Sequence, residues 1–169
     1  MISRFLRKVA VNFQQVRNMK VVPIPANEDN YQYLIIDEKT NVSAIVDPVD
    51  VDSILKTAKS EGSNLIAALV THHHWDHAGG TEAIAKASDG IIIYGGDADR
   101  IASINKVLNH RAEFKIGDLR VKALSTPCHT STHICYYITD QANNERAVFT
   151  GDTLFIGGCG RSLRVLRSR

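Results

Sequence analysis

Four histidines and one aspartate lie close together in the stretch that reads THHHWDHAGG. Imidazole nitrogens and carboxylate oxygens are ligands that zinc and iron take in proteins. Residues two apart in an extended segment point to the same side, so His72 and His74 can bind one ion while His73 faces elsewhere. Asp76 and His77 follow at a bend and could bind a second ion nearby. The stretch therefore predicts a metal site, the alternative being a histidine-rich surface loop that binds metal adventitiously.

Two further candidate ligands come later in the chain, each shortly after a predicted strand. His129 lies in TPCHT, and Asp152 lies in TGDT. A single histidine or aspartate in a loop is more often structural than functional. Three strand-end loops that each carry metal-ligand side chains are typical of a site built where loops converge. We therefore expect His129 and Asp152 to lie beside the histidine-rich stretch.

Short apolar runs alternate with helical patterns between these loops, which indicates an α/β fold (α+β) with a mixed, strand-rich core. The apolar run at residues 65–70 predicts a strand covered on both faces. It places the histidine-rich stretch at its carboxyl end, where open α/β folds carry their chemistry. Helices are expected at residues 51–60, 81–87 and 97–108. The other strands are expected at residues 21–24, 31–36, 43–46, 90–94, 114–116, 119–124, 134–138 and 147–149.

The chain has 169 residues, of which 44% are hydrophobic and 22% are charged. This composition is enough for one domain with a substantial core, and it excludes a wholly disordered chain. No apolar run approaches about 18 residues, so no transmembrane helix is expected. The three cysteines, Cys128, Cys135 and Cys159, form no C-x-x-C pair. Their spacing argues against a disulfide scaffold or a cysteine-built zinc site and fits a reducing compartment.

Positive charge is concentrated at the two ends of the chain. Nine basic residues and no acidic ones lie in residues 1–20 and 161–169, so removing them from the net charge of +2 leaves −7 for residues 21–160. A nucleic-acid-binding face would need its positive charge on the folded part, so nucleic acid is not an expected partner. Apolar residues recur at helical spacing between the arginines of residues 1–19, which is typical of a mitochondrial transit peptide. The alternative is an exposed basic helix on a cytoplasmic protein.

Taken together, the loops resemble those of glyoxalase II, the hydroxyacylglutathione hydrolase branch of the metallo-β-lactamase superfamily. The resemblance rests on THHHWDHAGG, on TPCHT, and on TGDTLF followed by GCG. It extends to residues 31–36 and 44–48 and to YGGD at residues 94–97, and it covers roughly residues 19–160. It implies a four-layer α-β-β-α sandwich that is followed by a helical domain.

The resemblance also implies a centre of two divalent metal ions. Zinc is the usual assignment in the family, and iron and manganese are alternatives. The implied ligands come from all three loops: His72, His74 and His129 for the first ion, Asp76 and His77 for the second, and Asp152 as the bridge between them. Arg161 lies where the family has a basic contact for glutathione, the alternative being a solvated charge near the chain end.

The reaction implied by the resemblance is hydrolysis of the thioester of S-lactoylglutathione to glutathione and a 2-hydroxy acid, a step in methylglyoxal detoxification. Two divalent ions about 3.5–4 Å apart lower the pKa of water and stabilise the oxyanion that forms when hydroxide attacks a carbonyl. Asp76 can orient the hydroxide, and Asp152 can contact both ions. The leaving group is a thiolate with a pKa of about 8.5, so it departs without a general acid. We expect a monomer whose partner is a small glutathione thioester.

The chain departs from the glyoxalase II pattern after Arg161. The family continues with an aromatic pair, the remaining strands, a further histidine ligand for the second metal and the helical domain. Residues 162–169 match none of these. We therefore expect a C-terminally shortened form in which the second metal lacks one ligand. It would have a basic extension at 1–19, the metallo-β-lactamase-like domain at 20–160 and an unrelated basic tail at 161–169.

Three functions are compatible with these residues. The first is a metal-dependent thioester hydrolase located in mitochondria or the cytoplasm. The second is a non-catalytic truncated form that binds metal only partly. The third is a mononuclear iron persulfide dioxygenase, a relative with a similar loop. A β-lactamase or a nuclease does not explain the extent of the resemblance.

Overall fold

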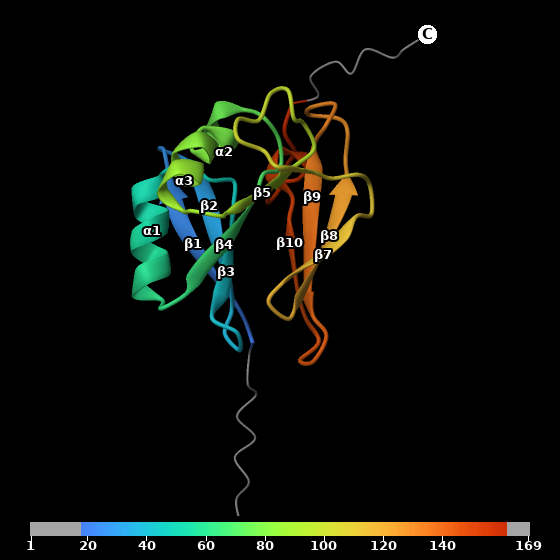
Figure 1. Cartoon of the computed structure of the whole chain (residues 1–169). Coiled ribbons are helices and arrows are strands. Elements are labelled where there is room, and N and C mark those ends of the chain that lie inside the picture. The colour runs from blue at the N-terminus through green and yellow to red at the C-terminus, as the bar shows by residue number, and fades with distance from the viewer. Residues whose placement is uncertain (1–17, 162–169) are drawn as a thin grey trace, which may run out of the picture.

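The computed structural model describes residues 18–161 as two β-sheets that face each other, with helices on the outer side of the first sheet (Figure 1). Residues 1–17 and 162–169 lie outside the described part, so the transit-peptide hypothesis and the tail stay predictions. None of the described helices is both long and apolar enough to cross a bilayer.

The first sheet contains six strands: β1 (Met19–Ala26), β2 (Asn30–Asp37), β3 (Val42–Val46), β4 (Asn64–Leu69), β5 (Ile92–Gly95) and β6 (Lys106–Val107). They lie side by side in chain order. The first three are antiparallel, and β3 to β6 are parallel. The end of β4 is buried, as expected for a parallel strand between two layers. The carboxyl ends of β3, β4 and β5 therefore meet at one edge of the sheet.

Three helices lie on the outer side of the first sheet (Figure 1): α1 (Val51–Ser60), α2 (Trp75–Ala78) and α3 (Thr81–Ala87). The first of them begins after Asp50, whose side chain accepts a hydrogen bond from the backbone nitrogen of Ser53 and acts as its N-cap. Ile54 of α1 and Ile84 of α3 are fully buried in the core that these helices share with the sheet. This packing fixes the segment between β4 and α3, which carries the histidine-rich stretch.

The second sheet contains four strands: β7 (Glu113–Ile116), β8 (Leu119–Ser125), β9 (Ile134–Asp140) and β10 (Glu145–Phe149). They form an antiparallel meander, because each strand pairs with the next along the chain. Alternate residues face the first sheet, so Val121, Tyr136 and Ile138 are buried in one cluster with Ile35 and Leu69. This core holds the two sheets together and thereby positions the loops at their ends.

The predicted sandwich of sheets and helices is confirmed, and each predicted strand is present near its expected position. The hairpin expected between β7 and β8 is also present. The resemblance implied four layers. Residues 18–161 form three, because no helix of this part covers the outer face of the second sheet (Figure 1). The domain boundaries at residues 19 and 160 stay predictions.

The helix predicted at residues 97–108 is wrong. The segment forms turns and then the short edge strand β6. The side chain of Asp97 accepts hydrogen bonds from the backbone nitrogens of Asp99 and Arg100, as the N-cap of a helix does. The turn does not continue, because Ser103 has φ of +60°, in the left-handed region that ends a right-handed helix. The Asn105 side chain contacts the backbone of β5 and its preceding residue, which leads the chain into the edge of the sheet.

Candidate metal centre

The three predicted loops converge at one end of the sandwich. The histidine-rich stretch follows β4, the loop with His129 leads into β9, and Asp152 follows β10. A backbone hydrogen bond of 2.9 Å from Ile134 N to Thr71 O joins the loop of the first sheet to the second sheet. The candidate ligands therefore come from both sheets.

One group of possible ligands consists of His72, His74 and His129, whose ligand atoms lie within 4.8 Å of one another. The Nδ1 atom of His74 lies 2.9 Å from Nε2 of His72 and 2.9 Å from Nε2 of His129. One proton on Nδ1 can satisfy only one of these contacts, whereas a cation among the three nitrogens would satisfy all of them. A tetrahedral zinc ion with bonds of about 2.0–2.1 Å spaces its nitrogens about 3.3 Å apart, so a small outward movement would admit it.

In two of these histidines, His72 and His129, the second ring nitrogen already contacts an oxygen atom. Nδ1 of His129 donates to the carbonyl oxygen of Arg161 at 2.8 Å, and Nδ1 of His72 lies 3.0 Å from Oγ1 of Thr71. The Thr71 hydroxyl in turn donates to Asp47, so it accepts from His72. Metal-binding histidines characteristically donate the other N–H in this way, which leaves the facing nitrogen free for an ion. The donor set fits a divalent metal.

A second group consists of His72, His77 and Asp152, whose ligand atoms also lie within 4.8 Å of one another. Nε2 of His77 lies 3.0 Å from Oδ1 of Asp152 and 3.6 Å from Oδ2 of Asp76. Oδ2 of Asp152 lies 3.3 Å from Nε2 of His129, so this carboxylate stands between the two groups. The structure thus brings together all six residues implied by the resemblance, with Asp76 at the more exposed rim.

Asp47, at the end of β3, is the functional residue that the sequence reasoning missed. Its buried carboxylate accepts hydrogen bonds from the backbone nitrogen and hydroxyl of Thr71, at 2.7 and 2.8 Å, and from Nδ1 of His77 at 2.9 Å. It therefore fixes both the start of the histidine-rich loop and the ring orientation of His77. The available signal was an aspartate at the carboxyl end of a strand parallel to β4.

The His77 ring lies between two carboxylates, those of Asp47 and Asp152. Burial alone would lower the pKa of His77, but the carboxylates of Asp152 and Asp47 outweigh it and raise the pKa to about 10. Burial alone would raise the pKa of Asp152, but the hydrogen bond from His77 outweighs it and lowers that pKa. The protonated imidazole thus occupies a position that suits a cation, and an ion at the second group would displace its proton.

His133 lies behind the first group without contributing to it. Its side chain is fully buried, its ring stacks on that of His72 at 4.9 Å, and its Nδ1 contacts the hydroxyls of Thr126 and Thr153 at 3.1 Å. Burial lowers the pKa of His133 to about 4, so the ring is neutral in the folded chain at neutral pH. It packs against His72 and supports its ring.

We expect the metal-free chain to lose stability as the pH falls from about 6.5 to 4. The unfolded chain binds a proton at His133 near pH 6.5, whereas the folded chain resists doing so until about pH 4, so acidification favours unfolding. Chemical denaturation across this range should give a shallower pH dependence for His133→Gln than for the wild type. His110→Gln, which changes an exposed histidine, should keep the wild-type slope. Equal slopes for all three proteins would contradict this account.

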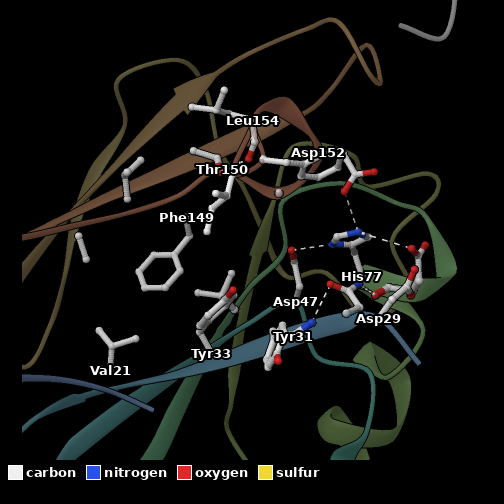
Figure 2. Close-up of a pocket in the computed structure, with 18 residues that line it drawn as sticks. Val21, Asp29, Tyr31, Tyr33, Asp47, His77, Phe149, Thr150, Asp152 and Leu154 are labelled. Atoms are coloured by element: carbon white, nitrogen blue, oxygen red, sulfur yellow. Dashed lines mark hydrogen bonds and ion pairs between the residues drawn. The ribbon is translucent and has the colours of Figure 1, made fainter. Parts of the chain in front are cut away.

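A groove of about 900 Å³ begins at the second ligand group and runs between the edges of the two sheets. Figure 2 shows His77 between the carboxylates of Asp47 and Asp152 at one end of this groove, with Tyr33 and Phe149 further along it. The lining combines the candidate ligands Asp76, His77 and Asp152 with apolar side chains that include Val21, Phe149 and Leu154. The centre is therefore open to a small molecule from this side.

The family model of the metallo-beta-lactamase superfamily matches residues 28–168. The chain belongs to the metallo-beta-lactamase superfamily. This membership agrees with the sandwich described above and with the position of the candidate ligands at its loop end. It confirms the fold expected from the resemblance.

Within this superfamily, two curated relatives carry the same name. The cytoplasmic hydroxyacylglutathione hydrolase of Arabidopsis thaliana is 44% identical over 144 residues, which cover 85% of this chain and 56% of the relative. The hydroxyacylglutathione hydrolase of Dictyostelium discoideum is 45% identical over 147 residues, which cover 85% of this chain and 54% of the relative. This chain thus spans about half the length of the curated relatives it matches.

A solved structure also matches the fold of this chain and is longer than it. A metallo-beta-lactamase from Staphylococcus aureus matches with a TM-score of 0.75 and 29% sequence identity. The match covers 87% of this chain and 47% of that one. The described part therefore shares its architecture with about half of a longer superfamily member.

Proposed function

We propose that this chain carries the metal centre of a thioester hydrolase that cleaves S-lactoylglutathione and related 2-hydroxyacyl glutathiones to glutathione and a 2-hydroxy acid. The observation that carries the proposal is the pair of ligand groups that share His72. The names of the two relatives support the substrate class. In a cell, this reaction would serve methylglyoxal detoxification.

The proposed centre binds two divalent ions. Six residues would hold them: His72, His74 and His129 the first, Asp76 and His77 the second, and Asp152 both. Zinc suits this set of imidazoles and carboxylates, and iron and manganese are alternatives. When bound, the pair supplies Lewis acidity and lowers the pKa of water. Apart from His72, which we assign to the first ion, His77 is the only histidine that residues 18–161 bring to the second group, so we expect the second ion to bind more weakly than the first.

The side chains around the centre would orient the reactants. The Asp76 carboxylate has 38% of its surface exposed, so it can accept a hydrogen bond from the attacking water and direct it at the thioester carbonyl. Asp152 is held in place by its contact with His77. The leaving thiolate has a pKa of about 8.5 and needs no proton donor. Arg161, exposed next to the His129 loop, would pair with a carboxylate of glutathione.

Two other functions are distinguished by specific observations. The presence of two ligand groups favours a two-metal hydrolase over the mononuclear iron persulfide dioxygenase. A non-catalytic form that binds metal only partly would keep the first group and lack turnover. The chain's coverage of about half of its relatives is the observation that makes this second candidate worth testing.

The deciding experiment uses the purified chain of residues 1–169 loaded with zinc. We expect loss of the S-lactoylglutathione thioester, followed by its absorbance, to stop after chelation and to return when zinc is added. Folded protein that binds zinc without turnover would support the non-catalytic candidate and reject the hydrolase. Oxygen consumption with glutathione persulfide by the iron-loaded chain would support the dioxygenase.

We expect Arg161→Ala to raise KM for S-lactoylglutathione about tenfold while kcat changes little. A charge-assisted hydrogen bond to an anionic substrate is worth about 1.5–3 kcal/mol, and it acts on ground state and transition state alike. Steady-state kinetics measure the effect, and Arg161→Lys should recover part of the loss. Arg120→Ala, an exposed arginine on β8, is the matched control and should keep the wild-type KM. An unchanged KM in Arg161→Ala would remove the proposed substrate contact.

We propose that residues 1–19 determine the compartment and that the active form is a monomer. A fluorescent fusion of the whole chain should enter mitochondria, and a fusion without these residues should stay in the cytoplasm. Cytoplasmic retention of both fusions would instead agree with the Arabidopsis relative, which is named as a cytoplasmic form. Size-exclusion chromatography of the zinc-loaded chain tests the oligomeric state.

A further inference from the structure

The corner that follows β5 packs closely on the loop that carries His129. A Cβ added at Gly96 would lie 2.3 Å from the carbonyl oxygen of Thr132, a distance that real side chains essentially never adopt. The same Cβ would lie 3.1 Å from the Ile134 side chain. Only glycine permits this approach, so the first sheet touches the loop of the second sheet backbone to backbone.

Asp97, the next residue, is buried and holds this corner to the loop. Its Oδ1 accepts hydrogen bonds from the backbone nitrogens of Asp99 and Arg100, at 3.2 and 3.1 Å, which fixes the turn. Its Oδ2 accepts a hydrogen bond of 3.0 Å from the hydroxyl of Thr132. Oδ2 also accepts from the guanidinium of Arg100. One carboxylate thus connects the end of β5 to the middle of the His129 loop.

The Arg100 guanidinium extends this connection to the histidine-rich stretch. Its Nη2 donates to the hydroxyls of Ser131 and Thr132, at 3.2 and 3.3 Å, while Nη1 lies 3.4 Å from Nε2 of His73. His73 stands between His72 and His74 in the chain. The side chain therefore bridges the loop after β4 and the loop before β9.

We infer that Asp97 and Arg100 are positioning residues that hold His129 against His72 and His74. The inference rests on the proposed function, because it concerns the same centre. Neither residue touches a ligand nitrogen. The backbone bond from Ile134 to Thr71 fixes only the far end of the loop, and Asp97 and Arg100 fix residues 131 and 132. Ligands that come from two sheets need such support, since a binding centre must be held to within about 0.5 Å.

The test compares Asp97→Asn with a matched control, Asp37→Asn. Asp37 is also buried, and it also accepts hydrogen bonds from a threonine hydroxyl and from backbone nitrogens. It lies at the end of β2, which runs antiparallel to β3, so it is at the opposite end of the sheet from the candidate ligands. Both substitutions weaken a buried polar cluster, and only Asp97→Asn should disturb the centre. Thr132→Val is a milder variant that removes one hydroxyl and keeps the corner.

Two measurements are made on each variant. In a cobalt(II) titration, Asp97→Asn should bind the first equivalent about tenfold more weakly and change its visible spectrum, the lower end of what loss of a direct hydrogen-bond partner of a ligand costs. In the metal-free chain, Asp97→Asn should speed amide hydrogen exchange in residues 126–134. Thr132→Val should also weaken cobalt binding and speed exchange in residues 126–134, each by a smaller factor than Asp97→Asn does. Asp37→Asn should leave the cobalt affinity and this exchange at wild-type values.

Wild-type cobalt affinity, spectrum and exchange in Asp97→Asn would overturn the inference. Equal effects of Asp97→Asn and Asp37→Asn on cobalt binding would also overturn it, since both would then act through general stability. A wild-type chain that binds cobalt but leaves the thioester intact would reject the proposed hydrolysis and keep this inference. The exchange measurement tests the hold on the loop even in a chain that binds no cobalt.

Discussion

Replacement of His74 by alanine should remove one equivalent of bound divalent metal and abolish metal-dependent thioester hydrolysis. His74 supplies the nitrogen that lies 2.9 Å from both other members of the first group, so its loss leaves the first ion with two imidazoles and the shared Asp152 carboxylate. Loss of an outer hydrogen-bond partner alone weakens a metal site by about 10–100-fold, so loss of a ligand should exceed about 100-fold. Metal content after dialysis, with a titration of the remaining site, measures the effect.

His129→Ala should give the same result, because His129 completes the group from the second sheet. His110→Ala is the control: His110 is exposed, and its ring nitrogen accepts a hydrogen bond from Ser125 N away from the candidate ligands. That variant should keep the wild-type metal content and turnover. Full metal content in either His74→Ala or His129→Ala would show that the ligand assignment is wrong at that residue.

Gly151→Ala should displace Asp152, remove the second metal equivalent and destabilise the chain by about 1–3 kcal/mol. Gly151 has φ of +45°, in the left-handed region that disfavours a side chain. An added Cβ would also lie 2.6 Å from Oγ1 of Thr71 and 2.8 Å from Nε2 of His133. Both atoms belong to buried side chains with no room to retreat, so the turn that carries Asp152 must move.

The control variant Gly90→Ala separates the effect of backbone strain from the effect of crowding by neighbouring atoms. Gly90 has φ of +74°, and an added Cβ would meet nothing within 4 Å, so this variant reports backbone strain without crowding. It should lower the unfolding free energy and leave metal content and thioester turnover intact. The measurements are chemical denaturation and metal analysis of both variants. Retention of both metal equivalents by Gly151→Ala would show that the turn tolerates a side chain.

The candidate ligands could be predicted because each occupies a recognisable place in the sequence. His72 and His74 follow an unbroken apolar run, which marks a buried strand and its carboxyl end. His129 and Asp152 lie next to strands of the second sheet. In each case a short local pattern determines where the loop begins, and the topology of the sheets brings the loops together.

Asp47 and the residues after Asp97 could not be predicted in the same way. The role of Asp47 depends on the pairing of β3 with β4, which brings its carboxylate to Thr71 and His77. Residues 97–108 have apolar residues at helical spacing, yet the backbone turns at Ser103, and the Asn105 side chain bonds to the backbone of residues 91 and 93, which draws the segment to the edge of the sheet. Both outcomes depend on contacts between segments far apart in the chain.

The division of the ligands between the two sheets has a consequence for how the chain responds to metal supply. His72 and His74 follow a strand of the first sheet, and His129 precedes a strand of the second sheet. An ion that binds all three therefore cross-links the two sheets. The complete set of ligands forms only in the folded state, so an ion binds that state more tightly and adds up to about 2.7 kcal/mol of stability when its free concentration is 100 times Kd. The fraction of folded chain in a cell would then depend on the concentration of the free ion. Depletion of the metal would therefore speed degradation of the chain.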